Sequence, residues 1–176
     1  MKVIGFCGLP GSGKSTAIEA ISDLGKIITM GDIIRNEAEI RKIEPTAENL
    51  GKIASDLRIK KGPEIIAKKC IEFIKNLSND VIFIDGLRSI YEVNEFRKNW
   101  KFPIIKVILN EDLRFKRLFK RGRSDDPSII KQLKQRDNRE LSLGLKDVLN
   151  KADYKISNDS SIESLKKNAR TCFNDN

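Results

Sequence analysis

The 176-residue sequence contains no histidine, and its three cysteines, Cys7, Cys70 and Cys172, lie far apart. Without histidine and without a Cys-x-x-Cys pair, the chain lacks the ligands of a structural zinc site. Three widely spaced cysteines do not form a disulfide framework, and Cys7 lies in an apolar run where it should pack as a small hydrophobe. We therefore expect a reducing, cytoplasmic location.

Long apolar runs are absent as well. Glycines interrupt the first residues too early for a signal peptide, and no run is long enough to span a bilayer. We expect no membrane partner. Acidic residues are in deficit, with 25 Asp and Glu against 34 Lys and Arg, which gives a formal net charge of +9. This balance favours anionic partners, which are nucleotides or nucleic acid.

Short apolar segments alternate with amphipathic ones along the chain. We predict strands over residues 3–7, 27–30, 81–84, 104–109 and 154–157. We predict helices over residues 14–24, 32–42, 46–61, 63–77, 89–98, 112–120, 127–140 and 161–173. Ser89 and Glu92 fit a capping box, and Asp126 fits a cap before Pro127. This alternation predicts one α/β domain over residues 1–176, built on a parallel sheet.

The stretch FCGLPGSGKST has the spacing of a phosphate-binding loop. An apolar strand precedes it and an amphipathic helix follows, which a glycine-rich turn with an incidental lysine does not explain. Backbone N–H groups should surround phosphate oxygens of ATP, Lys14 should reach the β- and γ-phosphates, and the Ser15 hydroxyl should ligate Mg²⁺. The predicted ATP-binding residues of this stretch are Gly8, Gly11, Ser12, Gly13, Lys14, Ser15 and Thr16.

Asp85 ends the apolar segment VIFID and precedes a glycine. Ligands of open α/β sheets gather at the carboxyl ends of the strands, and a carboxylate at that place can orient Mg²⁺. The alternative is an aspartate that only ends a strand before a turn. With the phosphate loop in the same chain, we favour a catalytic and metal-binding Asp85.

The segment MGDIIRNE, residues 30–37, follows the second predicted strand. A structural interpretation makes Asp32 a helix cap and Ile33, Ile34 and Ile40 a buried stripe. It does not explain Arg35, which it places in the first turn, where a cation opposes the helix dipole. An anion bound at this place would explain it.

The segment TMGDIIR resembles the Thr-Gly-Asp-x-x-Arg segment of nucleoside monophosphate kinases, adenylate kinase especially, with Met30 inserted after Thr29. The segment DGLR resembles that family's Asp-Gly-Phe-Pro-Arg, shortened by one residue and without the proline. The resemblance implies a three-layer P-loop NTPase fold with a five-stranded parallel sheet. It also implies a helical acceptor-binding arm over residues 32–77. The implied acceptor-binding residues are Thr29, Asp32, Arg35, Gly86 and Arg88.

The segment RFKRLFKRGRSDDP carries Arg114, Arg117 and Arg121 on one helix face. A solvated basic face is the plainer interpretation. The stretch RGRSDD resembles the lid of the same kinases, which implies a short lid over residues 114–126 with an Arg-x-Asp-Asp element. That element would comprise Arg123, Asp125 and Asp126, and the catalytic arginine that follows it would be Arg136, with Arg139 as competitor.

The stretch ADYKISNDSS, residues 152–161, resembles the segment that borders the donor adenine in this group, dephospho-CoA kinases included. It implies ATP contacts by Asn158 and by Arg117. As a whole the chain resembles a small, mostly archaeal family of adenylate-kinase-like proteins.

The resemblance implies a kinase that transfers the γ-phosphoryl group of ATP to a nucleoside monophosphate, AMP being favoured, with Mg²⁺ as cofactor. The catalytic residues would be Lys14, Asp85, Arg123 and Arg136, with Arg121 adding charge. One alternative is a kinase like dephospho-CoA kinase, whose hydroxyl acceptor needs a base such as Asp32. Another is a nucleotide-dependent switch or RNA-associated NTPase, ranked lower because the basic residues gather in the expected lid. A degenerate, non-catalytic kinase conflicts with an intact phosphate loop.

Overall fold

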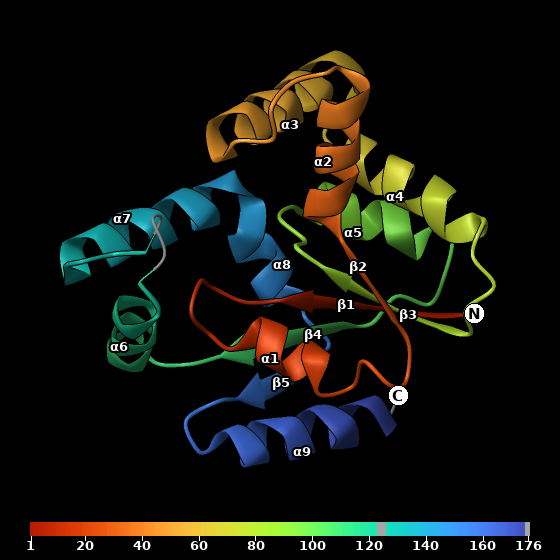
Figure 1. Ribbon diagram of the computed structural model, residues 1–176. Helices are drawn as coiled ribbons and strands as arrows, with labels where there is room; N and C mark the ends of the chain where they lie inside the picture. The colour runs from red at the N-terminus through yellow and green to blue at the C-terminus, as the bar shows by residue number, and fades with distance from the viewer. Residues whose placement is uncertain (123–125, 175–176) are drawn as a thin grey trace.

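A computed structural model describes residues 1–122 and 126–174 of the protein. Within these residues one parallel sheet has the strand order β2-β3-β1-β4-β5 (Figure 1). Its strands are β1 (Lys2–Cys7), β2 (Lys26–Thr29), β3 (Val81–Asp85), β4 (Ile104–Ile108) and β5 (Tyr154–Ser157). The predicted five-stranded parallel sheet is confirmed, and each predicted strand is present with its ends shifted by at most one residue.

The strand β1 lies in the middle of the sheet, between β3 and β4. Val3, Ile4 and Phe6 are fully buried, as expected for a strand with a helical layer on each face. The register places Phe6 opposite Asp85, and Asp85 opposite Thr29 on β2. Three carboxyl ends therefore meet at one edge, and the phosphate loop leaves from the centre of that edge.

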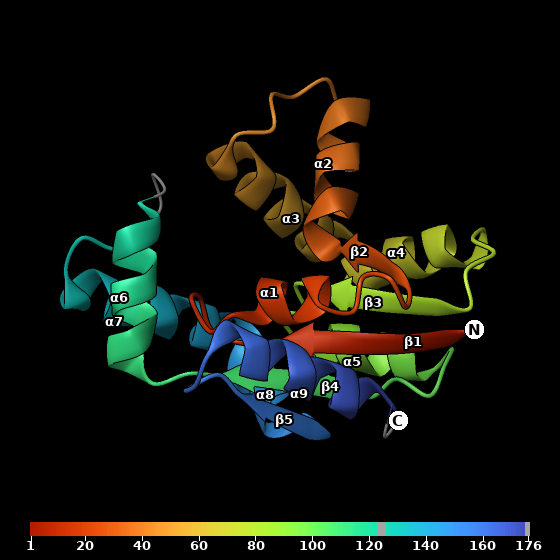
Figure 2. The same ribbon diagram turned by 60° about the horizontal axis from the view of Figure 1, so that its bottom comes forward.

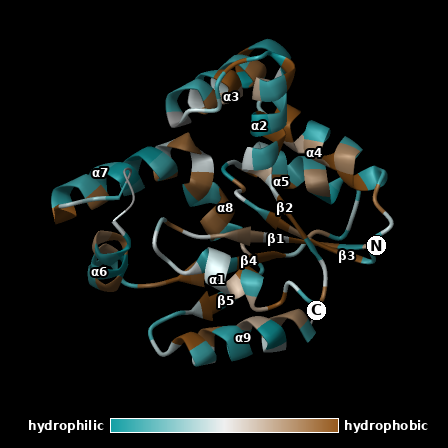
Figure 3. Ribbon diagram, in the orientation of Figure 1, coloured by the Kyte–Doolittle hydropathy of each residue, from teal (hydrophilic) through white to brown (hydrophobic). Residues whose placement is uncertain are grey.

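Helices cover the two faces of the sheet and give three layers (Figure 2). One face carries α1 (Lys14–Glu19) and α9 (Ile162–Asn174), and the other carries α4 (Ile65–Lys75), α5 (Ile90–Arg97) and α8 (Lys146–Asn150). Each face has its own hydrophobic cluster, and Figure 3 shows the hydrophobic residues gathered along the strands. None of the helices in the described residues is both long and apolar enough to cross a membrane.

Two helices, α2 (Met30–Ile40) and α3 (Ala47–Lys61), rise above the sheet in Figure 1. An ion-pair network ties them together and to α4. Arg41 donates to Glu37 at 2.9 Å and to Asp56 at 2.8 Å, and the Lys69 ammonium lies 2.9 Å from Glu37. The hydrogen bond from Lys69, with a further one from Arg41, lowers the pKa of Glu37 below its ordinary value. The α2–α3 pair is therefore anchored to the layer below it.

The start of α2 differs from the prediction. The helix begins at Met30, which is buried and was assigned to the preceding strand. Thr29 is the cap, since its hydroxyl accepts from the Asp32 N–H at 3.1 Å, so the prediction of Asp32 as the cap was wrong. Ile40 is 67% exposed and takes no part in the buried stripe. A hydroxyl one residue before the helix reaches the N–H groups that the Asp32 side chain, inside the helix, cannot.

The helices α6 (Glu111–Arg121) and α7 (Ile130–Glu140) lie beyond the carboxyl end of β1 (Figure 1). A buried ion pair joins them: Arg114 donates to both carboxylate oxygens of Asp137, at 2.9 and 2.5 Å. Arg114 also donates to the Pro10 carbonyl in the phosphate loop at 3.1 Å. The basic face of α6 is therefore not simply solvated, because its first arginine fixes both helices to the loop.

The predicted helix over residues 127–140 begins later and continues differently. It starts at Ile130 with Ile129 at the cap position, so the predicted cap at Asp126 was wrong, and that carboxylate instead accepts from Arg121 at 2.8 Å. After α7 the chain kinks within residues Leu141–Leu145 and continues as α8, and neither the kink nor α8 was predicted. Gly144 has φ 114°, and a Cβ there would lie 3.0 Å from the Arg88 carbonyl oxygen.

The Arg114–Asp137 pair gives a stability prediction. Asp137→Ala should lower the free energy of unfolding by about 3–5 kcal/mol, because it leaves a buried guanidinium without its carboxylate. The double variant Arg114→Met/Asp137→Leu should lose much less, since no unpaired charge stays buried. Urea unfolding followed by circular dichroism measures both, and equal losses would contradict the prediction.

Candidate active site

The phosphate loop curves tightly between β1 and α1. Gly11 and Gly13 have φ of 79° and 93°, values that side chains other than glycine rarely adopt. A Cβ on Gly13 would overlap the Asn158 side-chain amide, which donates to the Ser12 carbonyl at 2.8 Å. Asn158, from the end of β5, thus braces the loop from outside.

Ser12 is the most deeply buried polar residue of the loop, with 2% of its surface exposed. Its hydroxyl has no hydrogen-bond partner among the residues that the structure describes. A buried hydroxyl without a partner is costly unless a ligand or water satisfies it. This supports a polar ligand inside the loop.

Lys14 begins α1, and its ammonium contacts the Asp85 carboxylate at the end of β3. The two side chains are only 20% and 16% exposed, so solvent screens their attraction weakly. The lysine expected at the phosphates is thus paired with the carboxylate expected at the metal.

A cavity of about 570 Å³ opens beside the loop. The predicted residues that line it come from the loop, from the segment after β3, from α6, from α7 and from the segment after β5. They are Gly8, Gly11, Ser12, Gly13, Lys14, Ser15, Thr16, Gly86, Arg88, Arg117, Arg121, Arg136 and Asn158. The structure therefore brings the expected donor residues, one expected acceptor arginine and the expected lid arginine to a single hollow.

Three predicted acceptor residues do not line this cavity: Thr29 ends β2, and Asp32 and Arg35 lie on α2. Arg35 donates to Asp32 at 2.6 Å, and both side chains are more than half exposed. Because α2 begins at Met30, Arg35 lies in its second turn, so the dipole argument for Arg35 was wrong. Asp32, three residues earlier, already balances the charge of Arg35.

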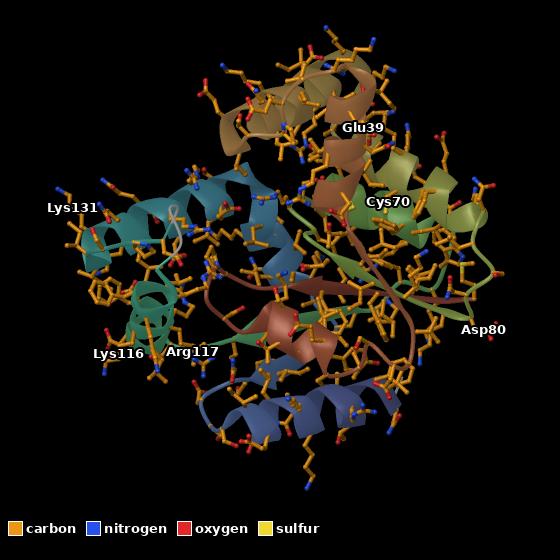
Figure 4. The ribbon with its side chains drawn as sticks, in the orientation of Figure 1. Glu39, Cys70, Asp80, Lys116, Arg117 and Lys131 are labelled. Atoms are coloured by element: carbon orange, nitrogen blue, oxygen red, sulfur yellow. The ribbon has the colours of Figure 1, made fainter. Side chains whose placement is uncertain are left out.

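The arginines of the cavity each contact an oxygen of this chain. Arg117 donates to Asn158 at 3.3 Å, and Figure 4 shows it on the side of α6 toward the phosphate loop. Arg121 and Arg136 both approach Asp126, with Arg136 at 3.5 Å. Arg88 pairs with Glu140. The predicted Arg123 and Asp125 lie outside the described residues.

Glu140 is a cavity residue that sequence reasoning missed. It stands in a charged helix end with no motif around it, so nothing in the sequence sets it apart. Its carboxylate is 13% exposed and faces both Arg88 and Arg139, the latter at 3.8 Å. It places a negative charge where the resemblance expects the acceptor's phosphate.

Burial governs the chemistry of Cys7, which directly precedes the loop. Burial raises the pKa of the Cys7 thiol to about 12, with Lys106 and Lys14 opposing the shift. Burial likewise raises the pKa of Cys70 to about 12. Both thiols stay protonated far above neutral pH, so neither is suited to act as a nucleophile.

These pKa values predict the reactivity of the thiols. At pH 8 Ellman's reagent should react quickly with Cys172 alone, because Cys7 and Cys70 are buried and protonated. The absorbance released by the reagent, followed over time in buffer and in denaturant, measures this reactivity. The Cys172→Ser variant should lose the fast phase. A second fast-reacting thiol in the folded protein would contradict it.

Comparisons with known proteins identify a matching family and similar sequences. The profile of a family described as AAA domain matches residues 7–134. A UPF0200/UPF0201 protein of Archaeoglobus fulgidus is 45% identical over 97% of this chain, which spans 54% of that protein. A UPF0200 protein of Methanosarcina mazei is 39% identical, with 97% of this chain and 92% of that protein covered.

Two solved structures share the fold at low sequence identity. TT1252 from Thermus thermophilus has a TM-score of 0.62 at 17% identity, covering 99% of this chain and 97% of that one. Shikimate kinase from Aquifex aeolicus has a TM-score of 0.58 at 14% identity, covering 98% and 96%. With a phosphate loop at the carboxyl edge of a five-stranded parallel sheet, this chain has the α/β fold of P-loop kinases, and it belongs to the AAA-domain family and to the UPF0200 proteins.

Proposed function

We propose that the protein is an ATP-dependent nucleotide kinase that phosphorylates a nucleoside monophosphate, with AMP as the favoured acceptor. One observation carries the proposal: a single cavity joins the phosphate loop to Arg88 of the segment after β3, Arg121 of α6 and Arg136 of α7. Phosphoryl transfer needs two anionic substrates in line and positive charge around the moving group. Planar guanidinium groups bind phosphate oxygens in pairs and suit this task.

ATP would bind with its phosphates in the loop and its base near Arg117 and Asn158. Lys14 would leave Asp85 for the β- and γ-phosphates, and the Ser15 hydroxyl and the Asp85 carboxylate would then hold Mg²⁺. Oxygen donors of this kind fit Mg²⁺. No cluster of three or more His, Cys, Asp or Glu that could hold a metal occurs among the described residues, which fits an ion carried by the nucleotide. Bound Mg²⁺ would neutralise charge on the transferred group.

The acceptor would lie between the cavity and the α2–α3 arm, with its phosphate on Arg88. Thr29, Asp32, Gly86 and Arg35 would complete the site once α2 and α3, the part of the predicted arm that stands above the sheet, close. Arg41 pairs with Glu37 on α2 and with Asp56 on α3, which supports a movement of these two helices as one body while α4 stays packed on the sheet. Closure would bring Arg35 to the acceptor and would exclude water.

The lid, residues 114–126, would supply charge to the transferred phosphoryl group through Arg121 and Arg123, together with Arg136 from α7. The positions of the two competing arginines favour Arg136. Its side chain is 19% exposed and lines the cavity, whereas that of Arg139 is 66% exposed. An arginine already aimed at the cavity loses less freedom when it binds.

A hydroxyl group is the second class of acceptor to be considered. One neighbour of similar fold is named shikimate kinase. The sequence after β5 resembles dephospho-CoA kinases, and that resemblance implies a hydroxyl acceptor. Such an acceptor needs a carboxylate base near the donor phosphates. Asp32 lies on the arm and is paired with Arg35, which weakens that candidate. The monophosphate acceptor, already ionised, needs no base and fits the arginine-rich cavity better.

An acceptor panel tests the proposal. The wild-type protein with MgATP should phosphorylate AMP faster than other monophosphates, dephospho-CoA or shikimate, measured as ADP formed and product identified by mass. Lys14→Ala should lower turnover by about 10²–10³-fold, because it removes a charge aimed at the developing transition state. Lys131→Ala, on the outer side of α7, is the matched control (Figure 4). Activity on a hydroxyl acceptor alone, or a fully active Lys14→Ala, would overturn it.

The acceptor arginines give a separate prediction. Arg88→Ala should raise the KM for the acceptor about tenfold or more, since a charge-assisted contact to phosphate is lost, and should leave the KM for ATP nearly unchanged. Arg35→Ala should act in the same direction, through the closed arm. Steady-state kinetics with each substrate varied in turn measures both. Equal changes in the two KM values would show that these arginines are not acceptor ligands.

A further inference from the structure

Glu92, at the first turn of α5, is a carboxylate with 1% of its side chain exposed. One oxygen accepts from the backbone N–H groups of Arg88 and Ser89, at 2.8 and 3.2 Å. The other accepts from the Arg58 guanidinium at 3.1 Å. The predicted capping box is present, with Glu92 closing it on Ser89. The added feature is the arginine, which comes from α3, 34 residues earlier in the chain.

The capping-box motif consists of two reciprocal hydrogen bonds and includes no ion pair. Glu92 is cut off from water, and a buried carboxylate is costly unless it is paired and hydrogen-bonded. The α2–α3 arm supplies the pairing cation, and the segment after β3 supplies the two N–H groups. The position of α3 and the position of the segment after β3 are therefore linked through the Glu92 carboxylate.

The segment that Glu92 holds is the one that carries Arg88 into the cavity. Upstream, Leu87 is 3% exposed and Gly86 has φ 93°, so the chain is fixed on that side as well. Downstream, the two N–H bonds to Glu92 set where the Arg88 backbone lies. The Arg88 side chain then reaches across the cavity to Glu140.

We propose that Arg58 and Glu92 are positioning residues: they align Arg88 with the acceptor cavity and couple that alignment to the place of α3. Neither side chain lines the cavity, so each acts through Arg88. The kinetic part of this inference rests on the proposed function, in which Arg88 holds the acceptor. The structural part, that Arg58 controls the Arg88 segment, does not depend on it.

Arg41 offers a matched control. It is an arginine of the same arm, and its side chain is 30% exposed against 31% for Arg58. It also bridges two elements, through Glu37 and Asp56, but it does not contact Glu92. Arg41→Met should therefore disturb the arm as much as Arg58→Met does, without touching the Arg88 segment.

Amide hydrogen exchange of the ligand-free protein gives the first test. In Arg58→Met the Arg88 and Ser89 amides should exchange about tenfold faster or more, because the carboxylate that accepts from them loses its cation. Amides of β3 report global stability and should change equally in the two variants. Arg41→Met should leave the Arg88 and Ser89 amides as in the wild type, and Arg58→Lys should restore part of the protection. Unchanged protection in Arg58→Met would overturn the inference.

Steady-state kinetics give the second test, because a role limited to fold stability would not change the KM for AMP selectively. Arg58→Met should raise the KM for AMP with little change in the KM for ATP, and it should add little to the increase caused by Arg88→Ala, because it acts through Arg88. Arg41→Met acts only on the arm, so any increase that it causes should add in full to that of Arg88→Ala. Faster exchange with an unchanged KM for AMP would overturn the coupling to the acceptor. If the wild-type protein phosphorylates no acceptor, the proposed function fails, and the exchange result alone decides whether Arg58 positions the Arg88 segment.

Discussion

The contact between Lys14 and Asp85 depends on the register that parallel pairing imposes on β1 and β3. Phe6 lies opposite Asp85, so the loop that leaves β1 and the carboxylate that ends β3 emerge at the same edge. A one-residue shift in the pairing of β3 with β1 would turn the Asp85 carboxylate to the other face of the sheet. The remaining parts of the site are arranged around this point: α6 packs on the phosphate loop through Arg114, and the Arg88 segment continues directly from β3.

Carboxylates of the same chain balance the cations of the candidate site. Asp85 faces Lys14, Glu140 faces Arg88, and Asp126 faces the arginines of α6 and α7. In the proposed function, a phosphate that enters would replace an ion pair of the chain, and its affinity would reflect the difference between the two interactions. Phosphate carries more charge than a carboxylate and offers more acceptor oxygens, so it would compete well for these cations. The same carboxylates offset the positive charge of the lysine and the arginines around the cavity.

Sequence patterns predicted the strands and the phosphate loop because both depend on neighbouring residues. The helix starts were harder, because Thr29 and Asp32 both fit a cap, and the choice depends on where the chain leaves β2. Arg114 had the spacing of a cavity arginine, yet it is buried against Asp137 from another helix. Glu140 and the Arg58–Glu92 pair had no local signal, since each depends on elements that meet only after folding.

The sequence by itself determined the α/β class, the parallel sheet and the nucleotide-binding loop. The apolar runs of β1, β3 and β4 are typical of strands buried on two faces, and the chemistry of the loop follows from the order of its glycines and lysine. The tertiary structure alone decided which charges meet. It paired Arg88 with Glu140, Arg114 with Asp137 and Arg58 with Glu92. Ion pairs between distant segments follow from the packing of helices on the sheet, which local periodicity does not specify.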